Sequence, residues 1–245
     1  MIKLINEPEK ISATNPFGIR IKALNNAYAD TDICDFYIDT KTGGAMAKCG
    51  DVLILDAENG IDREQLKSFC NLASVKTVLC SGELDFGDVT KTEGYILKYK
   101  GIEICPDFDN AAFNENIRDI YSLICDNLES DLSKIGFDTF YVDLSHKLRH
   151  GSAASAVIYN DEGDTPCSCA VAPFVCGEGA VISSVCTDKK FRRRGYGSVA
   201  VYALIAWLKE MKVSDVYLQI ENKALLDFYY PMGFAAVGTW QEIKI

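Results

Sequence analysis

The residues with the clearest chemical potential form a basic, glycine-containing segment, Arg192-Arg193-Arg194-Gly195-Tyr196-Gly197-Ser198. The triplet stands out because the sequence contains only seven arginines. Glycine lets the backbone approach an anion closely, and the first N–H groups of a helix lack intrahelical partners and lie at the positive end of its dipole. The segment therefore predicts a polyphosphate site. The alternative is a basic, solvated turn before a helix.

The elements that must position this segment alternate between strands and helices. Strand patterns cover 155–159, 167–173, 180–186 and 215–221, and residues 198–211 form an apolar helical pattern that must be buried against a sheet. We therefore expect an α/β fold with a mixed, mostly antiparallel sheet, in which 180–186 leads directly into the basic turn.

The first half of the chain has a similar order of elements. Residues 35–80 and 155–221 both read strand, strand, strand, helix, strand. A degenerate repeat and a chance similarity between two α/β regions are both compatible with this order. The first copy has the acidic segment 57–61 where the second has its arginines and glycines, so we expect one polyphosphate site. The predicted domains are 1–100, a smaller α/β domain, and 101–245.

Composition excludes several classes of protein. The chain has 245 residues, of which 48% are hydrophobic, and a net charge of −10, so nucleic acid is a poor partner. No segment has the pattern of a signal peptide or a membrane span, and the ten cysteines lie mostly in apolar runs. We therefore expect reduced thiols in a cytoplasmic protein. No metal site is expected, because Cys167, Cys169 and two histidines offer few ligands.

Residues beyond the glycine turn extend the pattern. Asn222 follows the strand at 215–221, Tyr229 lies seven residues later, and Gly233-Phe234 comes next. The sequence thereby resembles the GCN5-related N-acetyltransferases (GNAT), whose motifs are R/Q-x-x-G-x-G/A and N-x-x-A-x-x-x-Y-x-x-x-G-F. Leu225 stands where the second motif has alanine. The resemblance implies a GNAT fold for 101–245, with a splayed central pair of strands, and leaves 1–100 as a possible GNAT-like half.

The resemblance also implies roles for individual residues. The amides of Arg193 to Ser198 would bind the pyrophosphate of acetyl-CoA, with added charge from the arginines. The strand carrying Val185 and Thr187 would pair with the pantetheine arm, and the Val185 N–H would polarise the thioester carbonyl. Asn222 would hold the arm or the local loop. The predicted cofactor-binding residues are Val185, Thr187, Arg192, Arg193, Arg194, Gly195, Tyr196, Gly197, Ser198, Asn222 and Tyr229.

Three residues are catalytic candidates. Tyr229 is the predicted general acid, because a tyrosine pKa of about 10 and a thiol pKa of about 8.5 make proton transfer to the departing thiolate roughly balanced. A buried core position is the alternative. Glu178 and Glu221, each beside a strand end, are candidate bases for the attacking amine, and solvated surface carboxylates are the alternative for both.

The predicted function is direct transfer of the acetyl group of acetyl-CoA to a primary amine of a small molecule or peptide. The chain would act as a monomer or a homodimer. One alternative is a non-catalytic CoA-binding or interaction protein. Another is a dinucleotide-binding protein, because Gly195-Tyr196-Gly197-Ser198-Val199-Ala200 matches G-x-G-x-x-A, although too few residues follow for a nucleotide-binding half. The amine cannot be identified from these residues.

Overall fold

The computed structural model describes residues 1–5, 11–58, 60–101, 108–128 and 134–245. These residues form two compact units. The first unit contains Met1–Lys100 together with Tyr217–Ile245, and the second contains Gly101–Val216. The predicted break after residue 100 coincides with a boundary between the units, but 217–245 packs with the first unit. Because a compact unit is defined by contacts, the division into domains 1–100 and 101–245 stays a prediction.

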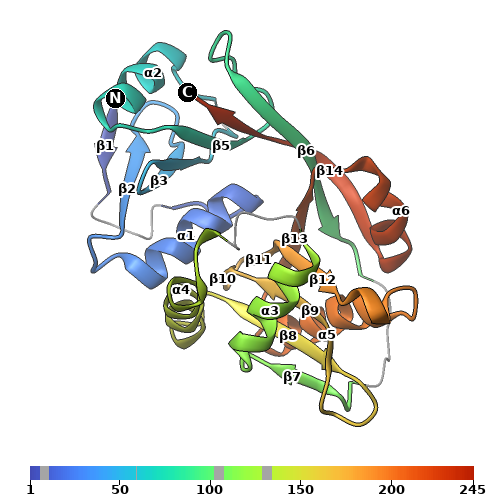
Figure 1. Ribbon diagram of the computed structural model, residues 1–245. Coiled ribbons are helices and arrows are strands. Elements are labelled where there is room, and N and C mark those ends of the chain that lie inside the picture. The colour runs from blue at the N-terminus through green and yellow to red at the C-terminus, as the bar shows by residue number, and fades with distance from the viewer. Residues whose placement is uncertain (6–10, 59, 102–107, 129–133) are drawn as a thin grey trace. The chain divides into compact units, whose positions relative to one another are not determined.

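The first unit is built on one mixed sheet, whose strand order is β1-β2-β3-β4-β5-β14-β6-β13. Strands β4 and β5 pair in parallel, whereas β1–β2, β2–β3, β3–β4, β5–β14, β6–β14 and β6–β13 pair antiparallel. Strand β14 lies between β5 and β6, which follow each other in the sequence (Figure 1). The elements are β1 (Ile2–Leu4), α1 (Pro16–Tyr28), β2 (Cys34–Asp39), β3 (Ala45–Cys49), β4 (Val52–Leu55), α2 (Arg63–Leu72), β5 (Thr77–Ser81), β6 (Thr90–Tyr99), β13 (Asp215–Ile220) and β14 (Phe234–Lys244).

Side-chain caps begin the helices α1 and α2. The Asn15 side chain accepts hydrogen bonds from the amides of Phe17 and Gly18 at the start of α1. Asp62 accepts from the Gln65 amide at 3.1 Å at the start of α2. One hydrophobic core joins α2 to the sheet. Its fully buried members include Met46, Leu53, Leu55, Leu66, Val78, Cys80 and Ile243, the last contributed by β14.

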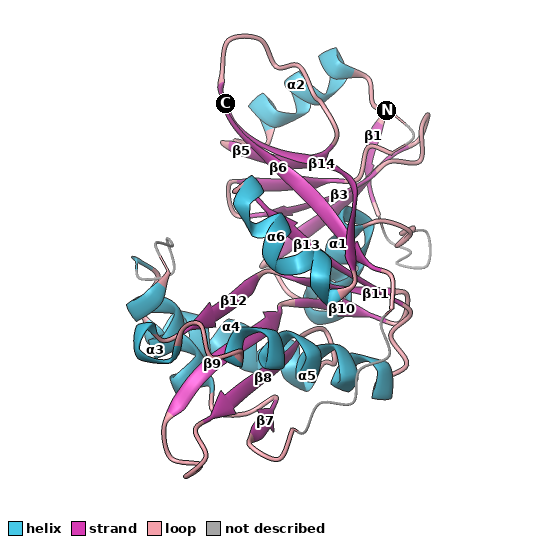
Figure 2. Cartoon of the chain, turned by 90° about the vertical axis from the view of Figure 1, so that its right-hand side faces the viewer, coloured by secondary structure: helices cyan, strands magenta, loops and turns pink. Residues whose placement is uncertain are grey.

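The second unit contains a four-stranded antiparallel sheet of order β12-β9-β8-β7 and a separate hairpin of β10 and β11. Its helices α3, α4 and α5 lie beside these strands (Figure 2). The elements are β7 (Ala111–Phe113), α3 (Ile117–Asn127), α4 (Phe137–Arg149), β8 (Ala154–Tyr159), β9 (Pro166–Ala172), β10 (Phe174–Cys176), β11 (Gly179–Ile182), β12 (Ser184–Thr187), the 3-10 turn η3 (Lys189–Phe191) and α5 (Tyr196–Glu210).

Strand β9 is the centre of this unit. It is buried from Cys167 to Ala172, so side chains cover both of its faces. Helix α3 packs on it through a core that includes Ile120, Ile124, Cys169 and Cys186, and α5 also packs against β8, β9 and β12. The predicted buried helix after the basic turn is confirmed as α5. The predicted strand 180–186 is interrupted at Ser183, which separates β11 from β12.

The two halves have related but not identical orders of elements. Strands β2, β3 and β4 are followed by α2 and β5, whereas the five strands from β8 to β12 are followed by α5 and β13, so the predicted identical order is wrong. In the first half, β4 and β5 are paired from Val52–Thr77 to Leu55–Cys80. The backbone groups between these two strands are therefore used by the sheet itself.

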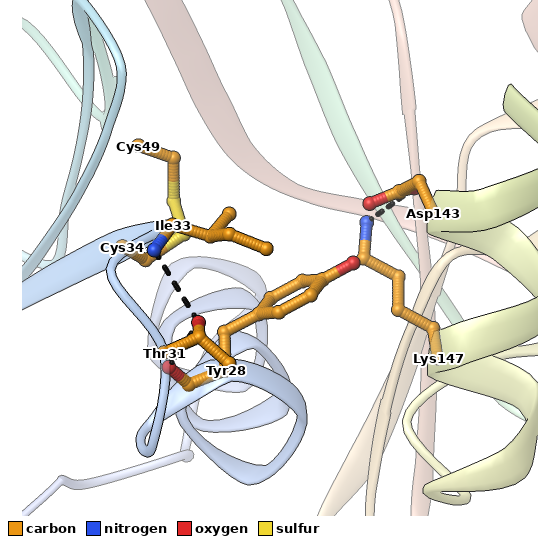
Figure 3. The surroundings of a disulfide bond; sticks show 7 residues. All are labelled: Tyr28, Thr31, Ile33, Cys34, Cys49, Asp143 and Lys147. Carbon is orange, nitrogen blue, oxygen red and sulfur yellow. Dashed lines mark hydrogen bonds and ion pairs between the residues drawn. A yellow bond between two sulfur atoms is a disulfide. The ribbon is translucent and has the colours of Figure 1, made fainter. Parts of the chain in front are cut away.

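A disulfide joins Cys34 of β2 to Cys49 of β3 (Figure 3). The expectation of reduced thiols is therefore wrong for this pair. The two residues lie directly opposite each other across the ladder, with their Cα atoms 4.3 Å apart, a proximity that sequence spacing does not reveal. Cys105 lies outside the described residues. The other cysteines are free thiols, namely Cys70, Cys80, Cys125, Cys167, Cys169, Cys176 and Cys186.

Within the part of the chain that the structure describes, no helix combines the length and the apolar character that crossing a membrane requires.

Candidate functional site

Among the strands that the structure describes, β12 pairs along one edge only. It is the outer strand of its sheet, and its ladder with β9 pairs Cys186 with Cys169. The Asp188 amide donates to the Cys167 carbonyl at 2.9 Å, and this bond shows which residues of the strand direct their backbone groups toward β9. Because backbone groups of successive residues point to opposite sides, the peptide groups of Cys186 face β9, and those of Val185 and Thr187 face the open edge.

The open edge begins at a β-bulge. The Ser183 amide donates to the Val171 carbonyl at 3.0 Å, whereas Ser184 is the ladder partner of Val171. Two residues of this strand thus oppose one residue of β9, which redirects the strand and separates the β10–β11 hairpin from the main sheet. The predicted splay between β12 and β13 stays a prediction, although the ladders place these two strands in different sheets.

The turn after β12 presents a row of backbone N–H groups. Arg193 and Gly195 have φ values of 63° and 87°, so both residues adopt left-handed backbone conformations before α5 begins at Tyr196. Gly195 occupies the N-cap position without a side-chain cap, and the first helical bond runs from the Val199 amide to the Gly195 carbonyl. Among the described residues, the amides from 193 to 198 have no hydrogen-bond acceptor. Such a concave row binds anions.

The three arginines have different surroundings. Arg192 donates from Nε to the Thr187 carbonyl at 3.1 Å and from Nη2 to the Asn127 carbonyl at 3.2 Å. Arg193 is exposed to solvent. Arg194 lies over the Phe191 ring at 5.7 Å and lines a cavity of about 360 Å³. The guanidinium of Arg192 is thus engaged by the protein, and the other two groups are available to an anion.

These features fit the pantetheine arm and pyrophosphate of an acyl-CoA. The edge of β12 offers the N–H groups of Val185 and Thr187 to an extended chain, whereas the Thr187 carbonyl already accepts from Arg192. The amides of residues 193–198 follow within the same turn and can surround a pyrophosphate. The second unit therefore brings together all the predicted cofactor-binding residues except Asn222 and Tyr229, which lie in the first unit.

Tyr229 ends the short helix α6 (Leu226–Tyr229) and is only 7% exposed. Its ring packs against Phe228 and Phe234, with centroid distances of 4.9 and 5.7 Å. Burial raises the pKa of Tyr229 to about 12. The expected near balance with a thiol is therefore wrong for the free protein, because burial favours the neutral phenol over the phenolate.

The remaining predicted residues lie at strand ends. Asn222 accepts a hydrogen bond from the Ala224 amide at 2.9 Å and caps the turn η4 (Lys223–Leu225), which agrees with its alternative role in the local loop. Glu221 is exposed beside it. Glu178 is exposed in the turn between β10 and β11. It lies seven residues before Val185 along the chain, and its role as a base stays a prediction.

Sequence reasoning missed two residues that contact this site. Ser168 donates to the Cys186 carbonyl at 2.6 Å and lies 3.0 Å from the Thr187 hydroxyl. Asn127, the last residue of α3, accepts from the Lys189 amide at 3.0 Å. Neither belongs to a recognisable motif, and their contacts span 18 and 62 residues of sequence.

The corresponding position in the first half is acidic. Asp56 follows β4 and is buried, which raises the pKa of its carboxyl group. The Asn15 side chain donates to Asp56 at 2.9 Å and to Glu58 at 3.0 Å. Two carboxylates would repel a polyphosphate, and the ladder between β4 and β5 leaves no open edge there. This arrangement supports the expectation of a single anion site.

Comparison with known proteins identifies the class. Residues 117–234 match the model of the Acetyltransferase (GNAT) family, and the resemblance seen in the sequence is confirmed. A search of curated proteins found no match. The similarity to the GNAT family therefore covers residues 117–234, and this matched region includes both predicted motifs.

Solved structures extend the similarity over the whole chain. A tandem GNAT protein from the clavulanic acid biosynthesis pathway has a TM-score of 0.58 and 11% identity, covering 100% of this chain and 98% of its own. A GNAT-family acetyltransferase from Colwellia psychrerythraea has a TM-score of 0.54 and 12% identity, covering 100% and 99%. A GCN5-related N-acetyltransferase from Sphaerobacter thermophilus has a TM-score of 0.56 and 10% identity, covering 100% and 95%. The fold of the whole chain is thus similar to the folds of these three proteins, and a GNAT-like first half stays a prediction.

Proposed function

We propose that this protein is an N-acyltransferase that moves the acetyl group of acetyl-CoA directly to a primary amine. The observation that carries the proposal is the continuity of β12 with the basic turn. An open strand edge, with the Val185 N–H directed outward, leads within eight residues to a row of unpaired amides beside two available arginines. In acyl-CoA the thioester arm is likewise followed by the pyrophosphate, so the arm would lie along the strand edge and the pyrophosphate at the row of amides.

Acetyl-CoA supplies a thioester carbon that a neutral amine attacks, so that a C–N bond forms, the C–S bond breaks and CoA leaves as a thiolate. The Val185 N–H would stabilise the negative charge that develops on the carbonyl oxygen. Tyr229 would donate a hydrogen bond to the departing sulfur, which matches its protonated state at neutral pH. The proton lost by the amine passes to a base or to water. Glu178 and Glu221 are the candidate bases.

Replacing Val185 by proline tests the central role. Proline lacks an N–H but is tolerated where that group faces an open edge, so the sheet should remain intact. We expect the rate of CoA thiol release with an accepted amine to fall about 10²- to 10³-fold, with the acetyl-CoA Kd changed little. Val185→Ala keeps the N–H and serves as the matched control. Equal rates for Val185→Pro and Val185→Ala would contradict the assigned role.

Ligand-induced stabilisation separates the alternatives. Acetyl-CoA should raise the Tm of the full chain, because a ligand that binds only the folded state stabilises it. Stabilisation by NAD but not by acetyl-CoA would overturn the proposal in favour of dinucleotide binding. Binding of acetyl-CoA without thiol release across a broad panel of primary amines would favour a non-catalytic CoA-binding protein.

A further inference from the structure

The end of helix α3 is tied to the turn that follows β12. Asn127, the last residue of α3, uses three polar groups, two of which bond to that turn. Its side-chain oxygen accepts from the Lys189 amide at 3.0 Å, and its backbone carbonyl accepts from Arg192 Nη2 at 3.2 Å. Its side-chain nitrogen donates to the Leu123 carbonyl at 3.0 Å, within α3. The bond to Leu123 thereby fixes the asparagine side chain on α3, and the other two bonds connect this residue to the turn.

These bonds fix both ends of η3. Lys189 is the first residue of this turn, and Arg192 follows its last residue. Arg192 also bonds to the Thr187 carbonyl at the end of β12, so the strand, the turn and α3 are connected through one guanidinium. The amides assigned to the pyrophosphate begin at the next residue, Arg193, whose φ of 63° is uncommon for a residue with a side chain.

The charge of Arg192 matches this location. The last carbonyl groups of a helix lack intrahelical donors and lie at the negative end of the dipole, where a cation is stabilising. Helix α3 is anchored in turn by buried Ile120 and Ile124. A backbone site binds an anion tightly only if its amides are already in place, because ordering a loop on binding reduces affinity.

We propose that Asn127 is a positioning residue for the acyl-CoA site. Together with Arg192, it holds the turn so that the amides from residue 193 onward converge on the pyrophosphate, and it does not touch the cofactor itself. This inference rests on the proposed function. It places the determinant of cofactor affinity at the end of α3, outside both sequence motifs.

The test measures the binding of two probes to the full-length Asn127→Ala variant by calorimetry or NMR titration. Acetyl-CoA contains the pyrophosphate, whereas S-acetylpantetheine lacks it and binds only along β12. We expect the acetyl-CoA Kd to rise about 3- to 10-fold, the effect of one lost hydrogen bond and a looser loop, with the S-acetylpantetheine Kd unchanged. Asn127→Asp keeps the acceptor for the Lys189 amide and should lie between wild type and Asn127→Ala.

Thr31→Val is the matched control. Thr31 lies just beyond α1, where its hydroxyl donates to the Tyr28 carbonyl at 2.9 Å and accepts from the Ile33 amide at 3.3 Å (Figure 3). Its loss should lower Tm without changing the acetyl-CoA Kd. An unchanged acetyl-CoA Kd in Asn127→Ala, or equal weakening of both probes, would overturn the inference. Failure of wild type to bind acetyl-CoA would refute the proposed function itself.

Discussion

The substitution Tyr229→Phe removes a hydroxyl group but keeps the ring that packs against Phe228 and Phe234. Burial raises the pKa of Tyr229 to about 12. A free thiol has a pKa of about 8.5, so complete proton transfer from Tyr229 to its thiolate is uphill by about 5 kcal/mol. Tyr229 therefore acts on the leaving sulfur as a hydrogen-bond donor. Such a bond to a charged group contributes about 1.5–3 kcal/mol, so kcat should fall roughly 10- to 150-fold.

The assay is CoA thiol release with an amine that wild type accepts, measured from pH 6 to pH 10. Tyr230→Phe is the matched control, because Tyr230 is a neighbouring, 45% exposed tyrosine, and it should retain full activity. A kcat for Tyr229→Phe within twofold of wild type would refute the hydroxyl's role. An inflection near pH 8–9 that is present in wild type and lost in Tyr229→Phe would refute the raised pKa.

The same raised pKa predicts a stability effect at alkaline pH. A group whose pKa is higher in the folded state contributes stability below its unfolded pKa, near 10 for tyrosine, and loses it as the pH rises through the folded value of about 12. The free energy of unfolding should therefore fall less steeply above pH 10 in Tyr229→Phe than in wild type. Urea unfolding at fixed pH values measures this difference, and parallel curves would contradict it.

Three further predictions concern packing, charge and stoichiometry. A Cβ at Gly94 would lie 2.1 Å from the Ile220 carbonyl oxygen, so Gly94→Ala should destabilise the protein by about 2–4 kcal/mol in urea unfolding. At Gly238 the nearest atom to an added Cβ is 3.8 Å away, so the control Gly238→Ala should change the free energy of unfolding far less. Arg193→Gln and Arg194→Gln should each weaken acetyl-CoA binding and reduce its salt dependence in calorimetry, and an unchanged salt dependence would argue against contact with phosphate. Calorimetry should also give one acetyl-CoA bound per chain. A stoichiometry of two would contradict the expectation that the first half holds no polyphosphate site.

Local elements of the fold were accessible from the sequence. The apolar helical pattern at 198–211 predicted α5. The insertion of β14 between β5 and β6 was not accessible, because periodicity reports which residues are buried and not which strand they pair with. The disulfide between Cys34 and Cys49 escaped prediction for the same reason, since it depends on the register of two strands.

The candidate site divides in the same way. The glycine turn was predictable because its chemistry resides in consecutive residues, and the open amides after Arg193 agree with that expectation. The break at Ser183 that leaves β12 with an open edge has no marker in the sequence. The contacts of Asn127 and Arg192 depend on where α3 ends in space, so Arg192 was assigned to the phosphate although it bonds to two protein carbonyls.

The position of β14 has a consequence for how the chain acquires its structure. During synthesis, residues 1–100 leave the ribosome on the order of ten seconds before 234–244, at about 5–20 residues per second. Until then β5 and β6 lack the strand that lies between them, and each has an unpaired edge open to other chains. The first unit therefore cannot complete its sheet at the time when residues 1–100 have just been synthesised. Aggregation should therefore be most severe for nascent or truncated chains without β14. The sheet of the first unit reaches its native pairing only when residues 234–244 insert between β5 and β6.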